Sequence, residues 1–390
     1  MGDTMGEESS DHLLRYFALH PDLLAHQPED YNGASAMTEM LAIHRVIPAR
    51  SLYRQMIKTG RPFRKIGQGT GGVVFGQEGT SFALKLAKSA DTPQLWNDYR
   101  MHLDIKKAFE NSQIARKTKI PACDKLVTKS YSKFFKKYPM LVAAAKRDCH
   151  TPTAVLITER IEPMPAPVRH GLISLYISPR NQVDAYMEKD NDDCLIRLYL
   201  GSMGGQEIKS TSIRNFELHL NQMHALGLNI DSYVNEMAAA LAVMHWKAKT
   251  DARGVEFVLG ASASEFTIFN ETHRLEPLTL SRTDIEILFR PVINLWVLDF
   301  DQVQRITLDE DGVAKAVSAA EANNPYIPRP LQSSIVEKRA WTFFAVKYLQ
   351  YSRMALNDKS MTYLPMLFLE GLIETEQKRQ EQNVSTAAKK

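Results

Sequence analysis

Residues 63–88, FRKIGQGTGGVVFGQEGTSFALKLAK, decide the fold of this chain. Two runs rich in β-branched and apolar residues flank the turn-like tetrapeptide Gln77-Glu78-Gly79-Thr80. The stretch therefore predicts a β-hairpin. The glycines at its entry form a loop whose backbone amides can come close to phosphate oxygens.

The motifs in this stretch match the order found in the protein-kinase fold. Gly67, Gly69 and Gly72 have the spacing of the kinase glycine-rich loop, and Lys85 takes the place of the lysine on the following strand. A glycine pattern alone is weak, because dinucleotide-binding loops share it, but those loops follow a strand and open a helix. The lysine inside a hairpin favours the kinase-like alternative.

Two further segments continue this order. A helix is expected over residues 95–109, where Asp98 is a candidate ion-pair partner for Lys85, although kinases use Glu there. A buried strand is expected over residues 154–161, and Glu159 near its end falls where the hinge between two lobes would lie. We therefore expect an α+β, two-lobed protein-kinase-like fold with extra N-terminal helices.

Acidic residues occupy the downstream catalytic positions of that order. A long helix expected over 231–249, capped by Asp231, is followed by Asp251 and Glu256, which have the spacing of the catalytic Asp and metal-binding Asn of a kinase. Asp299-Phe300-Asp301 then replaces the metal-binding Asp-Phe-Gly. Because Glu256 and Asp301 add charge where phosphoryl transfer needs a defined metal geometry, these changes argue against ordinary ATP-dependent phosphotransfer.

The chain divides into four parts by composition and pattern. We expect a helical extension, a β-rich part with a basic helical insert, a mainly helical part and a polar tail, over residues 1–60, 61–162, 163–374 and 375–390 respectively. A last long helix is expected over 334–355.

Cysteine content and hydropathy indicate the cellular compartment in which the protein is expected. The three cysteines have no CxxC spacing, which predicts neither a disulfide framework nor a zinc site. The sequence has no secretory leader pattern and no run of 18 apolar residues. We expect a cytoplasmic protein that does not act at a membrane.

Charge is distributed unevenly along the chain. Residues 106–147 carry 12 Lys and Arg against two acidic residues, a net charge of +10, whereas the whole chain carries +3 and the remainder therefore −7. Aromatic residues alternate with cations in SYSKFFKKY (130–138), a pattern suited to stacking on bases. The segment therefore predicts a polyanionic partner.

The phrases at 63–75 (FRKIGQGTGGVVF), 255–260 (VEFVLG), 295–303 (LWVLDFDQV) and 323–331 (NNPYIPRPL) resemble a known family. These are fungal proteins long labelled as hypothetical zinc-finger proteins of an uncharacterised domain, some of which are arginine-containing cyclodipeptide synthases. The resemblance runs from about Phe63 to about Trp341.

The resemblance implies a transferase that condenses arginyl-tRNA with a second aminoacyl-tRNA to a cyclic dipeptide (diketopiperazine). Such a product belongs to secondary-metabolite, alkaloid-type biosynthesis, in which tailoring enzymes act on it further. The aminoacyl ester is already activated, so ATP is not required, and no cofactor or metal ligand is assigned. The resemblance makes RNA, not DNA, the expected partner of the basic segment, contacted mainly through the sugar-phosphate backbone. Deprotonating the attacking amine requires a carboxylate, and the developing oxyanion requires charge stabilisation.

The candidate residues fall into three groups. As catalytic carboxylates we assign Glu256 (general base) and Asp251. The substrate-binding candidates are Asp299, Asp301, Arg329 and Glu159. The candidates for tRNA or phosphate binding are Gly67, Gly69, Gly72, Lys85, Lys129, Lys133, Lys136 and Lys137. His245 is expected to be a packed residue of the core.

Two alternatives remain open from the residues. One is an ATP- and Mg-dependent small-molecule phosphotransferase, with Asp251 as base and Asp299 on the metal. The other is a non-catalytic, pseudokinase-like scaffold that binds RNA or a nucleotide.

Overall fold

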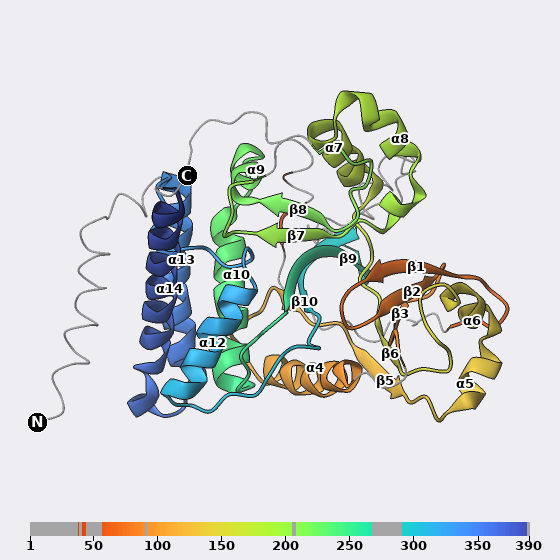
Figure 1. Ribbon diagram of the computed structural model, residues 1–390, viewed down its shortest axis with the longest axis horizontal. Coiled ribbons are helices and arrows are strands. Elements are labelled where there is room, and N and C mark those ends of the chain that lie inside the picture. The colour runs from red at the N-terminus through yellow and green to blue at the C-terminus, as the bar shows by residue number, and fades with distance from the viewer. Residues whose placement is uncertain are drawn as a thin grey trace, which may run out of the picture.

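The computed structural model describes residues 38, 41–43, 57–89, 93–204, 208–266 and 291–387. These residues form a mixed α+β protein with two five-stranded sheets (Figure 1). None of the described helices combines the length and the apolar character that a membrane span requires. Most of the helical extension expected over residues 1–60 lies outside the described residues.

The first sheet confirms the predicted hairpin. Its strands are antiparallel throughout and lie in the order β1 (Phe63–Gln68), β2 (Val73–Gln77), β3 (Phe82–Leu86), β6 (Val155–Glu159), β5 (Cys123–Val127). Burial along β3 alternates with the two-residue period of a strand, so Phe82, Leu84 and Leu86 enter the core while Lys85 points to the opposite face. That face carries the candidate site.

Two short helices cover the core face of this sheet. The helices α5 (Ser132–Lys137) and α6 (Pro139–Ala145) bring Phe134, Phe135 and Leu141 against Phe75 and Leu84. Both helices come from the basic segment, which also supplies β5 and the two-residue strand β4 (Thr118–Lys119). The basic segment is therefore partly helical and partly extended, and not wholly helical as expected. Most of its aromatic residues pack into the core of the first sheet.

The helix α4 (Gln94–Glu110) confirms the helix expected over 95–109 and lies between the two sheets, at the lower centre of Figure 1. Its buried residues recur at three- and four-residue spacing: Leu95, Asp98, Met101, His102 and Ile105. Asp98 therefore belongs to the buried stripe of the helix, directed at the site.

The second sheet has the order β4, β10 (Pro291–Leu298), β9 (Glu256–Phe266), β7 (Ile196–Tyr199), β8 (Phe216–His219). The strands β9 and β10 are antiparallel, and β4 runs parallel to β10. Since β4 belongs to the segment before β5, the chain crosses between the two sheets here. The candidate residues Glu256 and Asp299 stand at the start of β9 and just after β10.

Further helices follow the first sheet in the chain: α7 (Ala166–Tyr176), α8 (Gln182–Met187), α9 (Leu220–Ala225), α10 (Ile230–Ala242), α12 (Glu310–Ala322), α13 (Ile335–Ala355) and α14 (Leu364–Ala387). In the core, α10 packs against α13 (Figure 1). The predicted 231–249 helix is confirmed as far as Ala242 and then widens into a π-helical turn, Val243–Lys247. Its cap is Asn229, whose side chain accepts a hydrogen bond from the Ser232 amide, so the predicted capping by Asp231 is wrong.

The polar tail expected over 375–390 is helical as far as Ala387 and forms the second half of α14. Glu376 explains the difference, because its side chain is only 3% exposed and binds Arg329 and Arg379. Polar composition alone does not indicate a packed helix here. The buried ion pairs instead fix this turn of the helix against the core.

The buried carboxylate of Asp193 joins the first sheet to the part of the chain that follows it. Asp193 is bound by Arg64 of β1 at 2.7 Å, by Arg160 just after β6 at 3.1 Å, and by Arg214 at 3.4 Å. Burial raises the pKa of Asp193, and the three guanidinium groups oppose that shift. Asp193 and its three arginines hold β1 and the end of β6 against the segment around residue 193. They thereby fix the position of the first sheet relative to that segment.

Candidate active site

Lys85 lies at the centre of the site and contacts three carboxylates. Its Nζ is 2.6 Å from Asp98 Oδ2, 2.6 Å from Asp299 Oδ1 and 3.7 Å from Asp301 Oδ2. The ion pair with Asp98 that the sequence predicted is thus confirmed. Burial opposes the charged form of Lys85, but the three carboxylates outweigh it and raise its pKa. One positive charge faces three groups that can each carry a negative charge.

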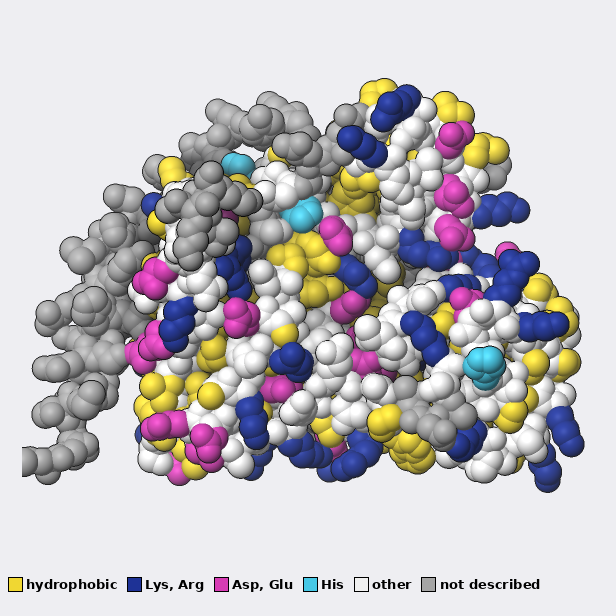
Figure 2. Space-filling model, viewed as in Figure 1, with side chains coloured by type: hydrophobic (Ala, Val, Ile, Leu, Met, Phe, Trp, Pro, Cys, Tyr) yellow, Lys and Arg dark blue, Asp and Glu magenta, His cyan; other side chains and the backbone are white. Residues whose placement is uncertain are grey.

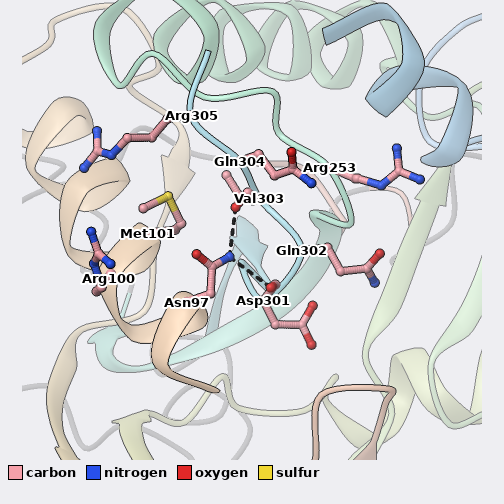
Figure 3. Close-up of a pocket in the computed structure, with 9 residues that line it drawn as sticks. All are labelled: Asn97, Arg100, Met101, Arg253, Asp301, Gln302, Val303, Gln304 and Arg305. Atoms are coloured by element: carbon pink, nitrogen blue, oxygen red, sulfur yellow. Dashed lines mark hydrogen bonds between the residues drawn. The ribbon is translucent and has the colours of Figure 1, made fainter. Parts of the chain in front are cut away.

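Helix α4 positions the acidic segment that follows β10. The Phe300 amide donates to Asp98 Oδ1 at 3.3 Å, and Asn97 Nδ2 donates to the carbonyl oxygens of Asp301 at 3.0 Å and Val303 at 2.8 Å (Figure 3). Asp299 has a φ of +66°, a backbone conformation rarely adopted outside glycine. The contacts from α4 maintain this strained turn, which brings two acidic residues to one lysine.

Asp301 has a buried carboxylate without a hydrogen bond. Its side chain is 0% exposed, and neither of its carboxylate oxygens has a hydrogen-bond partner among the described residues. The 3.7 Å to Lys85 Nζ is an ion-pair distance but too long for a hydrogen bond. Burial, followed by the charge of Asp299, raises the pKa of Asp301 to about 6, against the opposing effect of Lys85. Asp301 therefore exchanges a proton near neutral pH.

The glycine-rich loop closes over this acidic pair. The Gly69 amide donates to the Gly72 carbonyl at 3.0 Å, which tightens the loop. A Cβ on Gly71 would lie 1.9 Å from Asp301 Oδ2, and one on Gly72 would lie 2.5 Å from the Leu86 carbonyl oxygen. Only glycine fits at these two positions. The sequence reasoning selected Gly72 but missed Gly71; the adjacent glycine pair was the available signal.

Glu256 has a partner that the sequence did not indicate. Arg197 Nη2 donates to Glu256 Oε1 at 2.6 Å, and the two residues lie on the paired strands β7 and β9. Burial raises the pKa of Glu256 despite Arg197, and the charges of Asp299 and Lys85 act on it as well. Glu256 therefore lies within electrostatic range of the lysine cluster.

Two tyrosines in contact with each other, Tyr199 and Tyr326, lie near Glu256 and Arg197. The ring of Tyr326 lies edge-to-face on Tyr199, with centroids 5.1 Å apart, and its buried hydroxyl has no hydrogen-bond partner among the described residues. Burial, followed by the charge of Glu256, raises the pKa of Tyr326. The phenol therefore stays protonated and able to donate. Tyr326 comes from the 323–331 phrase, where the sequence reasoning selected only Arg329.

Asp251 is engaged by the backbone. Its Oδ1 accepts from the amides of Arg253 at 3.0 Å and Gln304 at 2.8 Å, and the residue is 3% exposed. Burial raises its pKa, and the backbone hydrogen bonds oppose the shift. The structure thus gives Asp251 a positioning role, because it ties the loop at 251–254 to the segment after the acidic pair.

Two expected site residues lie elsewhere. Arg329 does reach a carboxylate, but that carboxylate is Glu376 of α14, at 2.7 Å, in a separate small cavity behind α12. The expected substrate role of Arg329 is not supported by this position. Glu159 accepts from the Ala122 amide at 2.8 Å and thereby ties the residue before β5 to the end of β6. His245 is packed, as predicted: it is 1% exposed, and burial lowers its pKa to about 3.

The lysines of the basic segment lie on the surface, but most of its aromatic residues do not. Figure 2 shows Lys and Arg side chains along the lower edge of the molecule and around the outer helices of the first sheet. The four lysines assigned to tRNA, Lys129, Lys133, Lys136 and Lys137, are exposed. Phe134, Phe135 and Tyr138 are core residues, so their expected stacking on bases is wrong. Tyr131, 56% exposed, remains available beside a cavity of about 640 Å³ at β5 and α5.

A family model described as "Zinc finger protein" matches residues 295–360, which include Asp299, Asp301 and Tyr326. No curated protein matches the chain. Among the described residues no three His, Cys, Asp or Glu side chains are grouped so that they could hold a metal ion, and the cysteines Cys123, Cys149 and Cys194 are unpaired thiols.

Proposed function

We propose that the protein is a tRNA-dependent cyclodipeptide synthase, which condenses arginyl-tRNA with a second aminoacyl-tRNA. The observation that carries the proposal is Asp301, a buried carboxylate free of hydrogen bonds with a pKa of about 6, set beside Lys85 and two further carboxylates. Both steps of the reaction require a base for an ammonium group. A pKa near 6 suits that task at neutral pH.

The charge of the cluster supports a cationic substrate group. Asp98, Asp299 and Asp301 surround one ammonium, so negative charge exceeds positive charge whenever more than one of them is ionised. A guanidinium or an α-ammonium that reaches this cluster gains charge-assisted hydrogen bonds from its carboxylates, of which Asp299 is 23% exposed, whereas Asp301 becomes accessible only when the glycine loop moves away from it. Phosphate would be repelled. This changes the roles expected for Lys85 and the glycine loop, which we now assign to holding the acidic pair in place.

The proposed chemistry uses only the ester already present on the tRNA. Asp301 takes a proton from the α-ammonium of one aminoacyl-tRNA, and the resulting amine attacks the ester carbonyl carbon of the other. A C–N bond forms, the C–O bond to the ribose breaks, and the ribose oxygen leaves as a hydroxyl after it receives the second proton that the attacking nitrogen loses. The second amine then attacks the remaining ester in the same way and closes the six-membered ring.

Glu256 is the second carboxylate of this proposal. Its pKa is raised by burial, but its pairing with Arg197 at 2.6 Å makes it less available as a base than Asp301. We place Glu256 and Arg197 beside the lysine cluster, where both act electrostatically on the Tyr326 hydroxyl. That hydroxyl, which is protonated and has no partner among the described residues, is suited to donate to a developing oxyanion.

A two-lobed, kinase-like architecture is part of the proposal. Three features support it: the antiparallel order β1, β2, β3, β6, β5 of the first sheet, the pairing of Lys85 with a helix carboxylate, and its second pairing with the acid after β10. The substrates place the enzyme in the cytoplasm, where charged tRNAs occur. Tailoring enzymes of a secondary-metabolite pathway would act on the product.

A phosphotransferase is the second candidate, and the same pairings of Lys85 favour it. Such enzymes require their lysine to contact nucleotide phosphates and their acid to hold Mg²⁺. Here Lys85 is saturated by carboxylates, and the glycine loop lies against Asp301 at Gly71. A non-catalytic RNA scaffold is the remaining alternative.

One assay separates the three. Purified protein is incubated with arginyl-tRNA and a mixture of other aminoacyl-tRNAs, without ATP, and mass spectrometry searches for arginine-containing cyclic dipeptides. Product without ATP supports the synthase. ATP consumption with a small-molecule acceptor, and no dipeptide, would support the phosphotransferase. Neither product nor ATP consumption would favour the scaffold. Protein carrying Asp301→Asn is the matched control.

A further inference from the structure

A cavity on the outer side of α4 brings together three arginines from distant parts of the chain. It has a volume of about 530 Å³ and is open to solvent. Arg100 comes from α4, Arg253 from the loop before β9, and Arg305 from the segment after the acidic pair (Figure 3). Its volume falls in the range of nucleotide-sized ligands. The sequence reasoning did not select these arginines.

Most of the residues that line the cavity are polar or charged. Asn97, Gln302 and Gln304 line it beside the arginines, and Met101 and Val303 are its apolar residues. Asp301 also lines it, with its carboxylate at the far edge from Arg100 and Arg305 in Figure 3. Arg305 forms an ion pair with Asp104, but both side chains are largely exposed, so the pair is weak and exchangeable.

The arrangement of the arginines selects the kind of anion. Arg100 and Arg305 lie at one end of the cavity, and Arg253 points outward at the other end (Figure 3). The three guanidinium groups therefore do not converge on one point, as they would around a single phosphate. A chain of phosphates suits this arrangement better, and single-stranded nucleic acid provides one together with bases for the amide side chains.

We propose that this arginine pocket, defined by Arg100, Arg253 and Arg305, binds the single-stranded 3′ end of the tRNA. The inference rests on the proposed function and deepens it. Because Asp301 lines both this pocket and the lysine cluster, an RNA end held here delivers its aminoacyl ester to the proposed base. Phosphates are bound by arginines outside the acidic cluster, which would repel them.

The test measures tRNA affinity, without any reaction. Fluorescence anisotropy compares intact deacylated tRNA with the same tRNA lacking its unpaired 3′ nucleotides, across a salt series. Arg100→Gln and Arg253→Gln are each expected to weaken binding of the intact tRNA roughly three-fold and to reduce the slope of log K against log salt by about 0.7. Neither substitution is expected to change binding of the shortened tRNA.

Arg353→Gln is the matched control, because Arg353 is an exposed arginine on α13, outside this pocket. Equal affinities and slopes for the wild type and both pocket variants on intact tRNA would overturn the proposal. So would an equal loss on intact and shortened tRNA. If tRNA does not bind but a phosphopeptide does, and that binding needs Arg100, the pocket serves a protein partner and the proposal is wrong.

The two proposals can fail separately. If 3′-end-dependent binding is lost in the pocket variants, the inference stands even where no cyclic dipeptide forms, and only the synthase function is then refuted. If dipeptide forms normally in Arg100→Gln and Arg253→Gln with unchanged affinity for intact tRNA, the synthase stands and the pocket assignment is refuted.

Discussion

The ammonium of Lys85 lies 2.6 Å from the carboxylate of Asp299, although 214 positions separate the two residues in the chain. Lys85 stands on β3 of the first sheet, and Asp299 follows β10 of the second. The contact therefore joins the two sheets at the candidate site. Asp98 and Asp301 complete the cluster, so a change at Lys85 acts on three carboxylates at once.

Replacing Lys85 by Met is expected to destabilise the protein by about 3 kcal/mol, because it leaves buried carboxylates without a counter-charge. Urea unfolding at pH 7 measures the change. The double variant Lys85→Met with Asp98→Asn should recover part of the loss, since it removes one of the buried charges. A loss that is no smaller in the double variant would show that packing of the lysine stem, and not its charge, is responsible.

Asp301→Asn is expected to have a pH-dependent effect on stability. The pKa of Asp301 is about 6 in the folded protein against a usual 3.8, so the unfolded chain loses this proton first as the pH rises. Wild-type stability therefore falls relative to the variant between about pH 4 and pH 6. Above that window the variant should be more stable by about 1–3 kcal/mol, and below it the two should be equal.

Free energies of unfolding of the wild type and of Asp301→Asn, measured at pH 4, 5, 6 and 7, test this pH dependence. A stability difference that does not vary with pH would refute the raised pKa. In the condensation assay, wild-type kcat/KM should rise with pH around a midpoint near 6, and the variant should lack that rise.

Glu256→Gln and Arg197→Gln separate a catalytic carboxylate from a structural one. If Glu256 serves only to hold Arg197, both variants should lose the same activity, because each breaks the one 2.6 Å pair. We expect Asp301→Asn to lower kcat by at least about 100-fold, as loss of a general base does, and Glu256→Gln to lower it less. Turnover with pre-charged tRNA gives the ranking, and a larger loss in Glu256→Gln would return the role of base to Glu256.

Gly71→Ala and Gly69→Ala form a matched pair within one loop. A Cβ at position 71 would lie 1.9 Å from Asp301 Oδ2, whereas at position 69 the nearest of the atoms it meets is 3.9 Å away, on Asp299. We expect Gly71→Ala to displace Asp301 and to lower kcat/KM at least about tenfold, a cost above 1 kcal/mol. Gly69→Ala should stay near wild type. Similar losses in the two variants would mean that loop flexibility, rather than contact with Asp301, limits the reaction.

Local pattern was sufficient for the elements that carry strong periodicity. The 63–88 hairpin, the helix at 95–109 and the strand at 154–161 are confirmed. In such elements the spacing of apolar residues, every two positions in a strand and every three or four in a helix, follows directly from which face is buried. The pairing of Lys85 with Asp98 was also predictable, since both stand close in sequence on adjacent elements. Composition failed at the C-terminus, where Glu376 pairs with arginines and the helix continues.

The site depended more on long-range packing. Arg197 and Tyr326 were not predicted. Arg197 belongs to no motif, and the 323–331 phrase does not indicate that its tyrosine faces the site; only the pairing of β7 with β9 and the aromatic contact with Tyr199 bring the two residues to Glu256. The aromatic residues of the basic segment were assigned to stacking on RNA, yet Phe134 and Phe135 complete the core of the first sheet. A sequence window cannot tell an aromatic residue that faces bases from one that faces a sheet.

The sequence alone determined which chemical groups this protein has: a glycine loop, a strand lysine, acidic residues at fixed spacings, and a cationic segment. Tertiary structure decided how their charges combine. Near one another and out of water, Lys85, Asp299 and Asp301 interact strongly, so Asp301 is left with a pKa of about 6 and the site favours a cation. Charge interaction and burial depend on distance in space, and the fold sets that distance across the 214 positions that separate Lys85 from Asp299.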